Sequence, residues 1–276
     1  MRGKTVVITG ATSGIGEVAA IRLAEKGARI LFVAREAARA AATLKKLRHA
    51  GPGAAHAFHL ADLSCLAEMK RIGTLLAAEP RIDVLVNNAG AIFNRRRETA
   101  DGLEMTFALN HMAYFVVTAV LLGKLGRGAR IISTASGAHR RGALNFDDLQ
   151  LRHGYGGWRA YCRSKLCNIL FTRELARRLA GGGVTANAFH PGFVATRFGD
   201  GSGGLIGGFV GAAKAVGAIS PEEGAKTLVH LAASPQVAGI SGEYFYQCRP
   251  QLPAKAARDD AAARHLWEVS ERIAAL

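Results

Sequence analysis

The sequence predicts a doubly wound α/β fold, in which a parallel sheet lies between two layers of helices in a three-layer αβα arrangement, formed as a single domain over residues 1–276. Three observations support this fold class. Short runs rich in Val, Ile and Leu alternate with longer stretches of helical periodicity. The apolar runs lack polar alternation, which is typical of strands covered on both faces. No internal repeat, low-complexity tract or linker divides the chain.

Strands and helices are expected to alternate along most of the chain. The expected strands are residues 4–9, 28–34, 54–60, 82–88, 129–135, 184–190 and 243–246. The expected helices are residues 14–26, a second ending near residue 50, 66–78, 102–122, 158–180, one that Ser220 would cap, and a short C-terminal helix. Repeated βα units of this kind build a parallel sheet with helices on both faces.

The composition indicates a soluble globular protein. Apolar residues make up 49% of the chain and charged residues 21%, enough to bury a large core. The stretch 201–219 is apolar, but its glycines disfavour a stable membrane helix, so we expect no integral membrane segment. The start of the chain lacks the features of a secretory signal. Four cysteines lack CxxC spacing, so we expect no metal site and a reducing, cytoplasmic location; they are Cys65, Cys162, Cys167 and Cys248.

The net charge of +15 raises nucleic acid as a partner, but the distribution of arginines argues against it. The arginines are spread along the chain, with clusters at Arg95 to Arg97 and at Arg140 and Arg141. Neither cluster is interleaved with aromatic residues that would stack on bases. We therefore expect no nucleic-acid partner, and we expect Arg95 to Arg97 to form a solvated loop.

A glycine-rich loop follows the first expected strand and opens the first expected helix. Its glycines, Gly10, Gly14 and Gly16, have a GxxxGxG spacing. Glycines in this place allow a tight turn, a close approach of the backbone to a pyrophosphate, and anion binding at a helix N-terminus. The loop therefore predicts a dinucleotide cofactor.

The end of the second expected strand bears on the choice between NAD and NADP. An acidic residue there would bind the ribose 2'-hydroxyl of NAD, whereas this chain has Ala34 followed by Arg35. The Arg35 guanidinium can instead bind a 2'-phosphate, although Glu36 beside it could neutralise this charge. We predict NADP(H) as the preferred cofactor, with NAD(H) as the alternative.

Tyr161 and Lys165 stand one helical turn apart in an otherwise largely apolar segment. Residues at this spacing project from the same helix face. A phenol has a pKa of about 10, too high for efficient proton exchange near neutral pH. A lysine ammonium at about 4 Å would lower that pKa, so the pair predicts a tuned acid and base, although the spacing alone is weak evidence.

The motifs taken together resemble those of the short-chain dehydrogenase/reductase family. They are TGxxxGxG ending at Gly16, NNAG at Asn87 to Gly90 and YxxxK at Tyr161 to Lys165. The segments LNHMAYF and HPGFVATRF are further similar to the branch that contains retinol dehydrogenases and protochlorophyllide reductases. The resemblance spans nearly the whole chain and implies a Rossmann fold.

The resemblance also implies roles for individual residues. It implies a catalytic tetrad of Asn110, Ser136, Tyr161 and Lys165. Ser133 and Thr134 lie close by, and the choice of Ser136 rests on its match to an SSxAH pattern in which Ala135 replaces the first serine. The implied cofactor contacts are Gly10, Thr12, Ser13, Gly14, Ile15, Gly16, Arg35, Asp62, Leu63, Asn88, Ala89, Gly90, Tyr161, Lys165, Pro191, Gly192, Val194 and Thr196.

We therefore expect an NADP(H)-dependent oxidoreductase that transfers hydride between the nicotinamide and a carbonyl or alcohol. Tyr161 would exchange the proton, Ser136 would bind the same oxygen, and Asn110 would hold a water near Lys165. The family resemblance places a substrate lid at residues 193–219, whose apolar side chains predict a bulky, lipophilic substrate. Reduction of an activated C=C bond, or a redox-neutral or cofactor-sensing role, are the alternatives.

Four further expectations concern assembly and neighbouring residues. The resemblance implies a homodimer or homotetramer built through residues 102–122 and 158–180. Whether the lid touches a membrane is left open. We interpret His139 as part of a surface loop, His190 as structural, and Cys162 as a packed thiol rather than a nucleophile.

Overall fold

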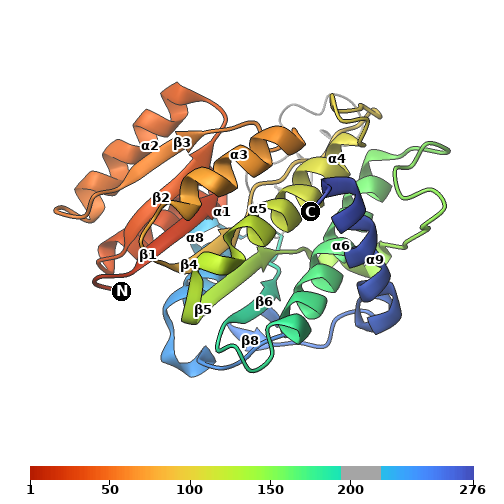
Figure 1. The fold of residues 1–276 in the computed structure, drawn as a ribbon. Coiled ribbons are helices and arrows are strands. Elements are labelled where there is room, and N and C mark those ends of the chain that lie inside the picture. Colours follow the sequence, from red (N-terminus) through yellow and green to blue (C-terminus); the bar gives the residue numbers. More distant parts are fainter. Residues whose placement is uncertain (194–218) are drawn as a thin grey trace.

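A single mixed sheet lies between two helical layers in the computed structural model, which describes residues 1–193 and 219–276 (Figure 1). The strand order is β3-β2-β1-β4-β5-β6-β7-β8. The strands are β1 Thr5–Thr9, β2 Arg29–Ala34, β3 Ala57–Leu60, β4 Ile82–Asn87, β5 Leu125–Thr134, β6 Thr185–Phe189, β7 Tyr244–Tyr246 and β8 Arg249–Pro250. All neighbouring strands pair in parallel except β7 and β8. The predicted doubly wound fold is thus confirmed, and the domain count stays a prediction.

The short antiparallel strand β8 was not predicted. It pairs with β7 through Tyr246 and Arg249, across a turn formed by Gln247 and Cys248. Both turn residues have positive φ, 47° and 62°. Two-residue hairpin turns usually contain Gly or Asn. Neither residue is present here, so the sequence contains no indication of a hairpin.

The helices lie on the two faces of the sheet, and each face packs against its helices through one apolar cluster. One face carries α1, α2 and α8, and the other carries α3, α5, α6 and α9. The bounds are α1 Gly14–Glu25, α2 Ala37–Ala50, α3 Leu66–Ala77, α4 Met105–Phe107, α5 Ala113–Leu121, α6 Gly157–Arg178, α8 Pro221–Ala233 and α9 Asp260–Ala274. Ser220 caps α8 as predicted, because its side chain accepts a hydrogen bond from the Glu223 amide (3.2 Å).

The expected helix 102–122 begins later and is not regular. Gly102 has φ +72°, outside the helical region, and Glu104 caps the helix by accepting hydrogen bonds from the Thr106 and Phe107 amides. A π-helical stretch, Ala108–Met112, separates α4 from α5. Among the described residues, only Met105–Lys124 is long and apolar enough to span a membrane, and 72% of its most apolar window is buried inside the protein.

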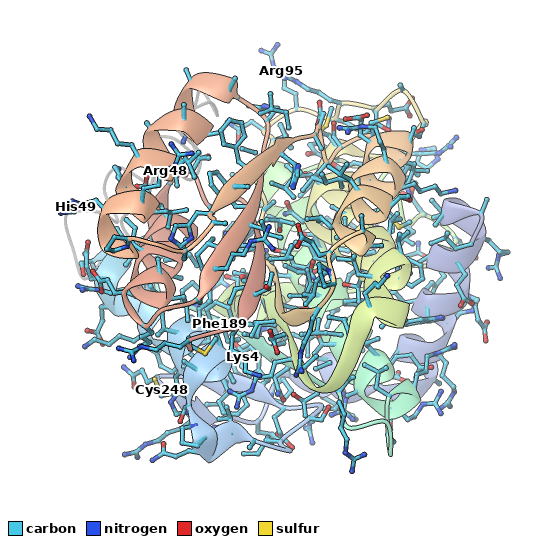
Figure 2. The ribbon with its side chains drawn as sticks, turned by 60° about the vertical axis from the view of Figure 1, so that its left-hand side comes forward. Lys4, Arg48, His49, Arg95, Phe189 and Cys248 are labelled. Carbon is cyan, nitrogen blue, oxygen red and sulfur yellow. The ribbon has the colours of Figure 1, made fainter. Side chains whose placement is uncertain are left out.

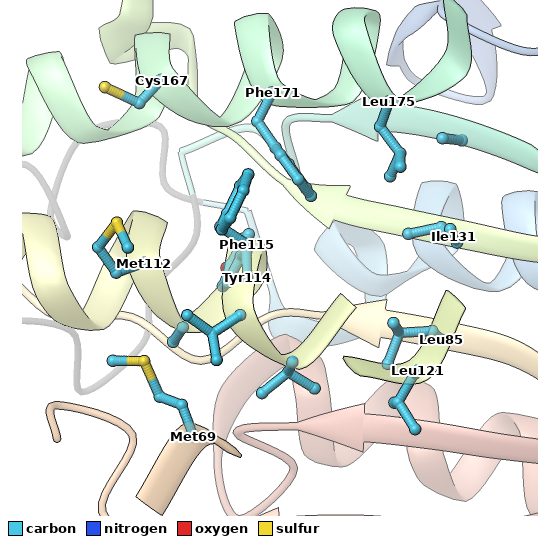
Figure 3. Packing of buried hydrophobic residues seen from close by; sticks show 14 of the residues in the cluster. Met69, Leu85, Met112, Tyr114, Phe115, Leu121, Ile131, Cys167, Phe171 and Leu175 are labelled. Carbon is cyan, nitrogen blue, oxygen red and sulfur yellow. The ribbon is translucent and has the colours of Figure 1, made fainter. Parts of the chain in front are cut away.

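The C-terminal helix α9 is longer than the short helix predicted, and it packs along α6. The Trp267 indole stacks on the Phe171 ring (centroids 5.9 Å apart) and meets the Phe115 ring edge-on (4.9 Å). Figure 3 shows Phe115 and Phe171 facing each other between α5 and α6. The oligomer expected through residues 102–122 and 158–180 stays a prediction. Helix α9 covers part of the α6 surface that the expected subunit interface would use.

Charged side chains lie on the surface of the molecule, and Figure 2 shows two of them, His49 and Arg95, at the edge of the view. The loop prediction for Arg95 to Arg97 is confirmed for its two exposed ends only. Arg96 is half-buried, and its guanidinium donates to the Gln150 carbonyl (3.3 Å) and the Glu98 carboxylate (2.7 Å). The middle arginine therefore anchors the loop.

Candidate active site

The glycine loop connects β1 to α1 at the carboxyl edge of the sheet, where doubly wound folds bind ligands. Gly10 and Gly14 have φ of +70° and +55°, which glycine adopts without strain. A Cβ at Gly10 would lie 2.7 Å from the Ala89 Cα, and one at Gly16 would lie 2.3 Å from the Gly10 oxygen. Within the described residues, the Ser13 side chain makes no capping bond, so the first amides of α1 are left for an anion.

Asn88 ties the loop after β4 to the glycine loop. Its side-chain amide donates to the carbonyls of Thr9 (3.2 Å) and Gly10 (3.0 Å). The Thr9 hydroxyl in turn accepts hydrogen bonds from the amides of Asn88 (2.9 Å) and Ala89 (3.1 Å). The predicted contacts at residues 10–16 and 88–90 are therefore brought together.

Arg35 follows β2 with its side chain 68% exposed, and its Nη2 lies 3.5 Å from a Glu36 oxygen. A second arginine, not predicted from the sequence, lies in the first turn of α2: Arg39 donates to the Thr12 carbonyl (3.3 Å). Both guanidinium groups belong to the segment beside the glycine loop.

Asp62 and Leu63 follow β3, next to the end of β2, where the Ala61 amide donates to the Ala34 carbonyl (3.0 Å). The Asp62 carboxylate accepts from the amide (3.0 Å) and hydroxyl (2.8 Å) of Ser64 and so closes its own turn. Leu63 is buried. These two residues thus lie on the same carboxyl edge as the other predicted cofactor contacts.

Three predicted catalytic residues surround the carboxyl end of β5. Lys165 is buried in α6, and its Nζ donates to the Thr134 carbonyl (2.9 Å) and lies 5.7 Å from the centroid of the Tyr161 ring. Ser133 and Thr134 are buried, whereas Ser136 is partly exposed. The Ser136 hydroxyl oxygen accepts a hydrogen bond from the Ala138 amide (3.2 Å), so Ser136 is the hydroxyl placed to meet a ligand.

The protonation equilibria of the pair differ from the sequence-based expectation. Burial raises the pKa of Tyr161 to about 12, although a hydrogen bond with Ser136 opposes this shift. Burial also lowers the pKa of Lys165 to about 7. The pKa of the phenol is therefore shifted upward and not downward as expected, because burial of Tyr161 disfavours the charged phenolate.

Asn110 sits in the π-helical stretch and bridges two elements of the site. Its Oδ1 accepts from the Ala91 amide (2.8 Å), and its Nδ2 donates to the Ala91 carbonyl (2.9 Å) and the Ser164 hydroxyl (3.0 Å). A Cβ at Gly90 would lie 3.0 Å from the Asn110 Oδ1 and 3.6 Å from the Lys165 Nζ. Asn110, Gly90 and Lys165 thus meet, and the water-holding role stays a prediction.

The residues after β6 are only partly described. Gly192 has φ +94°, and its amide donates to the His190 Nδ1 (3.1 Å). The His190 ring stacks on the Tyr246 ring (4.0 Å), in agreement with a structural role. Residues 194–218, which include Val194, Thr196 and most of the expected lid, lie outside the described residues. Their predicted roles therefore stay predictions.

Two minor predictions have opposite outcomes. Cys162 is buried, and burial raises the pKa of its thiol to about 11, as expected of a packed thiol. The surface-loop interpretation of His139 is wrong, because the side chain is fully buried. A loop residue can be buried when a distant segment covers it, which the local sequence does not reveal.

Comparison with known proteins accounts for this arrangement. A family model described as short chain dehydrogenase matches residues 4–202. The chain belongs to the short-chain dehydrogenase family. It is 41% identical to mouse retinol dehydrogenase 14, over 98% of this chain and 86% of that protein, and 40% identical to human retinol dehydrogenase 13, over 99% and 85%. These relatives support the retinol dehydrogenase-like branch.

Solved structures share the fold of this short-chain dehydrogenase. An uncharacterised protein from Mycobacterium paratuberculosis superimposes with a TM-score of 0.80 at 29% identity, over 99% of this chain and 94% of that one. A short chain dehydrogenase from Burkholderia cenocepacia, solved in complex with NADP, gives a TM-score of 0.71 at 27% identity, over 88% and 96%. The close backbone approaches at Gly10 and Gly16 fit the nicotinamide dinucleotide that such enzymes bind.

Proposed function

We propose that the protein is an NADP(H)-dependent oxidoreductase that transfers hydride between the nicotinamide and a carbonyl or alcohol of a lipophilic small molecule. The observation that carries this proposal is the convergence of Ser136, Tyr161 and Lys165 at the end of β5, next to the glycine loop. Membership of the short-chain dehydrogenase family supports an enzyme acting on alcohols or carbonyls.

The protein residues divide the proton chemistry among them. When bound, the cofactor supplies or accepts the hydride. In the reductive direction Tyr161 donates its phenol proton to the substrate oxygen. The Ser136 hydroxyl oxygen already accepts a hydrogen bond from the Ala138 amide. Its hydroxyl hydrogen is therefore left to bind the substrate oxygen. Lys165 can take up or release a proton near neutral pH, since its pKa is about 7.

The reaction is tested by following NADPH oxidation with a panel of apolar aldehydes and ketones and identifying the products. Conversion of a carbonyl to an alcohol is expected. Saturation of a C=C bond instead would establish the alternative reductase activity. Tight NADPH binding without turnover of any panel member would favour a redox-neutral role.

Preference for NADP(H) is supported by two guanidinium groups beside the glycine loop, those of Arg35 and Arg39. Replacing Arg35 by alanine is expected to weaken NADPH binding by about 10- to 150-fold, the loss of one charge-assisted hydrogen bond. Fluorescence titration with NADPH and NADH measures it. NADH binding should not change, and Arg48→Ala, at the far end of α2, serves as the control. An equal loss for both cofactors would contradict the 2'-phosphate role.

A lipophilic substrate is supported by an exposed aromatic side chain at the site. Trp158 is 44% exposed and packs against the Tyr161 ring (centroids 5.8 Å). Covering an exposed apolar side chain with an apolar ligand is favourable, because apolar surface of both is removed from water. The indole therefore offers an apolar wall one turn before the proposed proton donor.

Replacing Trp158 by alanine is expected to raise KM for an apolar aldehyde by about tenfold, because apolar contact area is lost. The KM for a small polar carbonyl should change little. Steady-state kinetics of both substrates measure the difference. Leu75→Ala, on α3 and 44% exposed, is the matched control. An unchanged KM for the apolar substrate would remove Trp158 from the substrate site.

A further inference from the structure

His139 is a buried histidine that joins the Ser136 segment to a part of the chain more than a hundred residues away. Its Nδ1 lies 2.7 Å from the Ser136 carbonyl oxygen, and its Nε2 lies 3.1 Å from the Ala254 amide nitrogen. A carbonyl can only accept and an amide N–H can only donate. These two partners therefore assign the neutral form with the proton on Nδ1.

The surroundings hold the imidazole in this form. Burial lowers the pKa of His139, and the positive charge of Arg140 acts in the same direction. The ring also packs edge-on against the Tyr244 ring (centroids 4.9 Å). The side chain of Arg140 adds a second link to the same distant segment by donating to the Leu252 carbonyl (3.3 Å).

Ser136 is thereby held at both of its oxygen atoms. Its carbonyl accepts two hydrogen bonds, from the His139 Nδ1 and from the His139 amide (3.1 Å). Its hydroxyl oxygen accepts the Ala138 amide (3.2 Å). The first of these bonds depends on the orientation of the imidazole, and Ala254 fixes that orientation.

We propose that His139 is a positioning residue that holds the catalytic Ser136 against the segment after β8, so that Ala254 takes part in setting the catalytic geometry. This inference rests on the proposed function, because it assumes that the Ser136 hydroxyl binds the reacting oxygen. Misplacement of a catalytic group by about 1 Å can cost about 100-fold in rate. Loosening one of several restraints on Ser136 is expected to cost less.

The Ala254 backbone permits a selective test. Its φ of −56° and ψ of 155° suit proline, which lacks the N–H that His139 accepts. The ring Cδ of proline would take the place of that hydrogen, so the imidazole must also shift away from Ala254. In Ala254→Pro we expect kcat to fall about tenfold, with NADPH binding and KM within about twofold of the wild type. Lys255→Pro is the matched control, because it places a proline at the first position of the following 3-10 turn, where no amide partner is needed.

A second variant removes the same hydrogen bond from the other side. In His139→Asn, the side-chain amide nitrogen stands where Nδ1 stood and still donates to Ser136, but nothing reaches Ala254. We expect kcat to fall about tenfold, and we expect the double variant to resemble His139→Asn alone, because both changes remove one bond and the shorter asparagine does not meet the proline ring. Additive losses, or single variants with kcat within about twofold of wild type, would overturn the inference.

Nuclear magnetic resonance provides a readout that does not depend on turnover. In wild-type protein the His139 nitrogens should show the Nδ1–H form, and the Ser136 carbonyl resonance should move in Ala254→Pro. A wild-type protein that turns over no carbonyl or alcohol would contradict the proposed function. The Ser136 resonance would then decide the inference by itself: a shift would support the positioning role, and an unmoved resonance would overturn it.

Discussion

Replacing Tyr161 by phenylalanine is expected to lower kcat by about 10²- to 10⁴-fold, the range attributed to general acid and base catalysis. The substitution removes the phenol proton but keeps the ring that packs against Trp158. NADPH binding should remain within about twofold, since the glycine loop and the Asn88 loop are untouched. Stopped turnover with intact cofactor fluorescence would be the signature of a lost proton donor.

Tyr155→Phe is the matched control for this variant. Tyr155 lies six residues earlier, and its hydroxyl donates to the Phe93 carbonyl (2.8 Å), away from the Lys165 and Ser136 side chains. We expect it to alter stability rather than kcat. If Tyr161→Phe turned over substrate at the wild-type rate, proton transfer would have to come from another group, and the proposed mechanism would be wrong.

Replacing Gly16 by alanine is expected to weaken NADPH binding by at least about 100-fold. The new Cβ would lie 2.3 Å from the Gly10 oxygen and 2.5 Å from the Asn88 Nδ2, so the loops after β1 and β4 must move apart. Overpacking of this kind costs about 1–3 kcal/mol or more, so the melting temperature should also fall. Fluorescence titration and thermal unfolding measure the two effects.

Gly123→Ala is the control for the glycine-loop variant. A Cβ at Gly123 meets nothing within 4 Å, and the position does not need a positive φ. We expect NADPH binding and stability close to those of the wild type. Wild-type NADPH affinity in Gly16→Ala would show that the loop tolerates the side chain, and the cradle assigned to it would have to be abandoned.

Local patterns predicted the fold because each depends on neighbouring residues. The apolar runs at β1, β2 and β4 identify strands covered on both faces, and β2 and β4 lie almost wholly in the core. The glycine loop was recognisable because its backbone requirements are met only by glycine. Where the local signal was missing, as at the turn of Gln247 and Cys248 that leads to β8, the prediction failed.

The residues of the site were largely foreseeable, but their environments were not. The spacing of Tyr161 and Lys165 placed them on one face of α6, as a helical period requires. The direction of their pKa shifts depends on how much of the chain packs over them, and burial reversed the expected lowering for Tyr161. Arg39 was missed because its position beside the glycine loop depends on a hydrogen bond to the Thr12 carbonyl, 27 residues away.

The sequence by itself determined the order of strands and helices except for β8, the glycine cradle at residues 10–16 and the pair Tyr161 and Lys165, and the motifs it shares with its family added Ser136. Only the tertiary structure decided that His139 is buried, that it bonds Ala254, and that α9 packs along α6. The physical reason is the distance along the chain over which each interaction acts. Backbone propensity and side-chain periodicity act over a few residues, whereas burial and hydrogen-bond partners depend on segments that meet only when the whole chain folds.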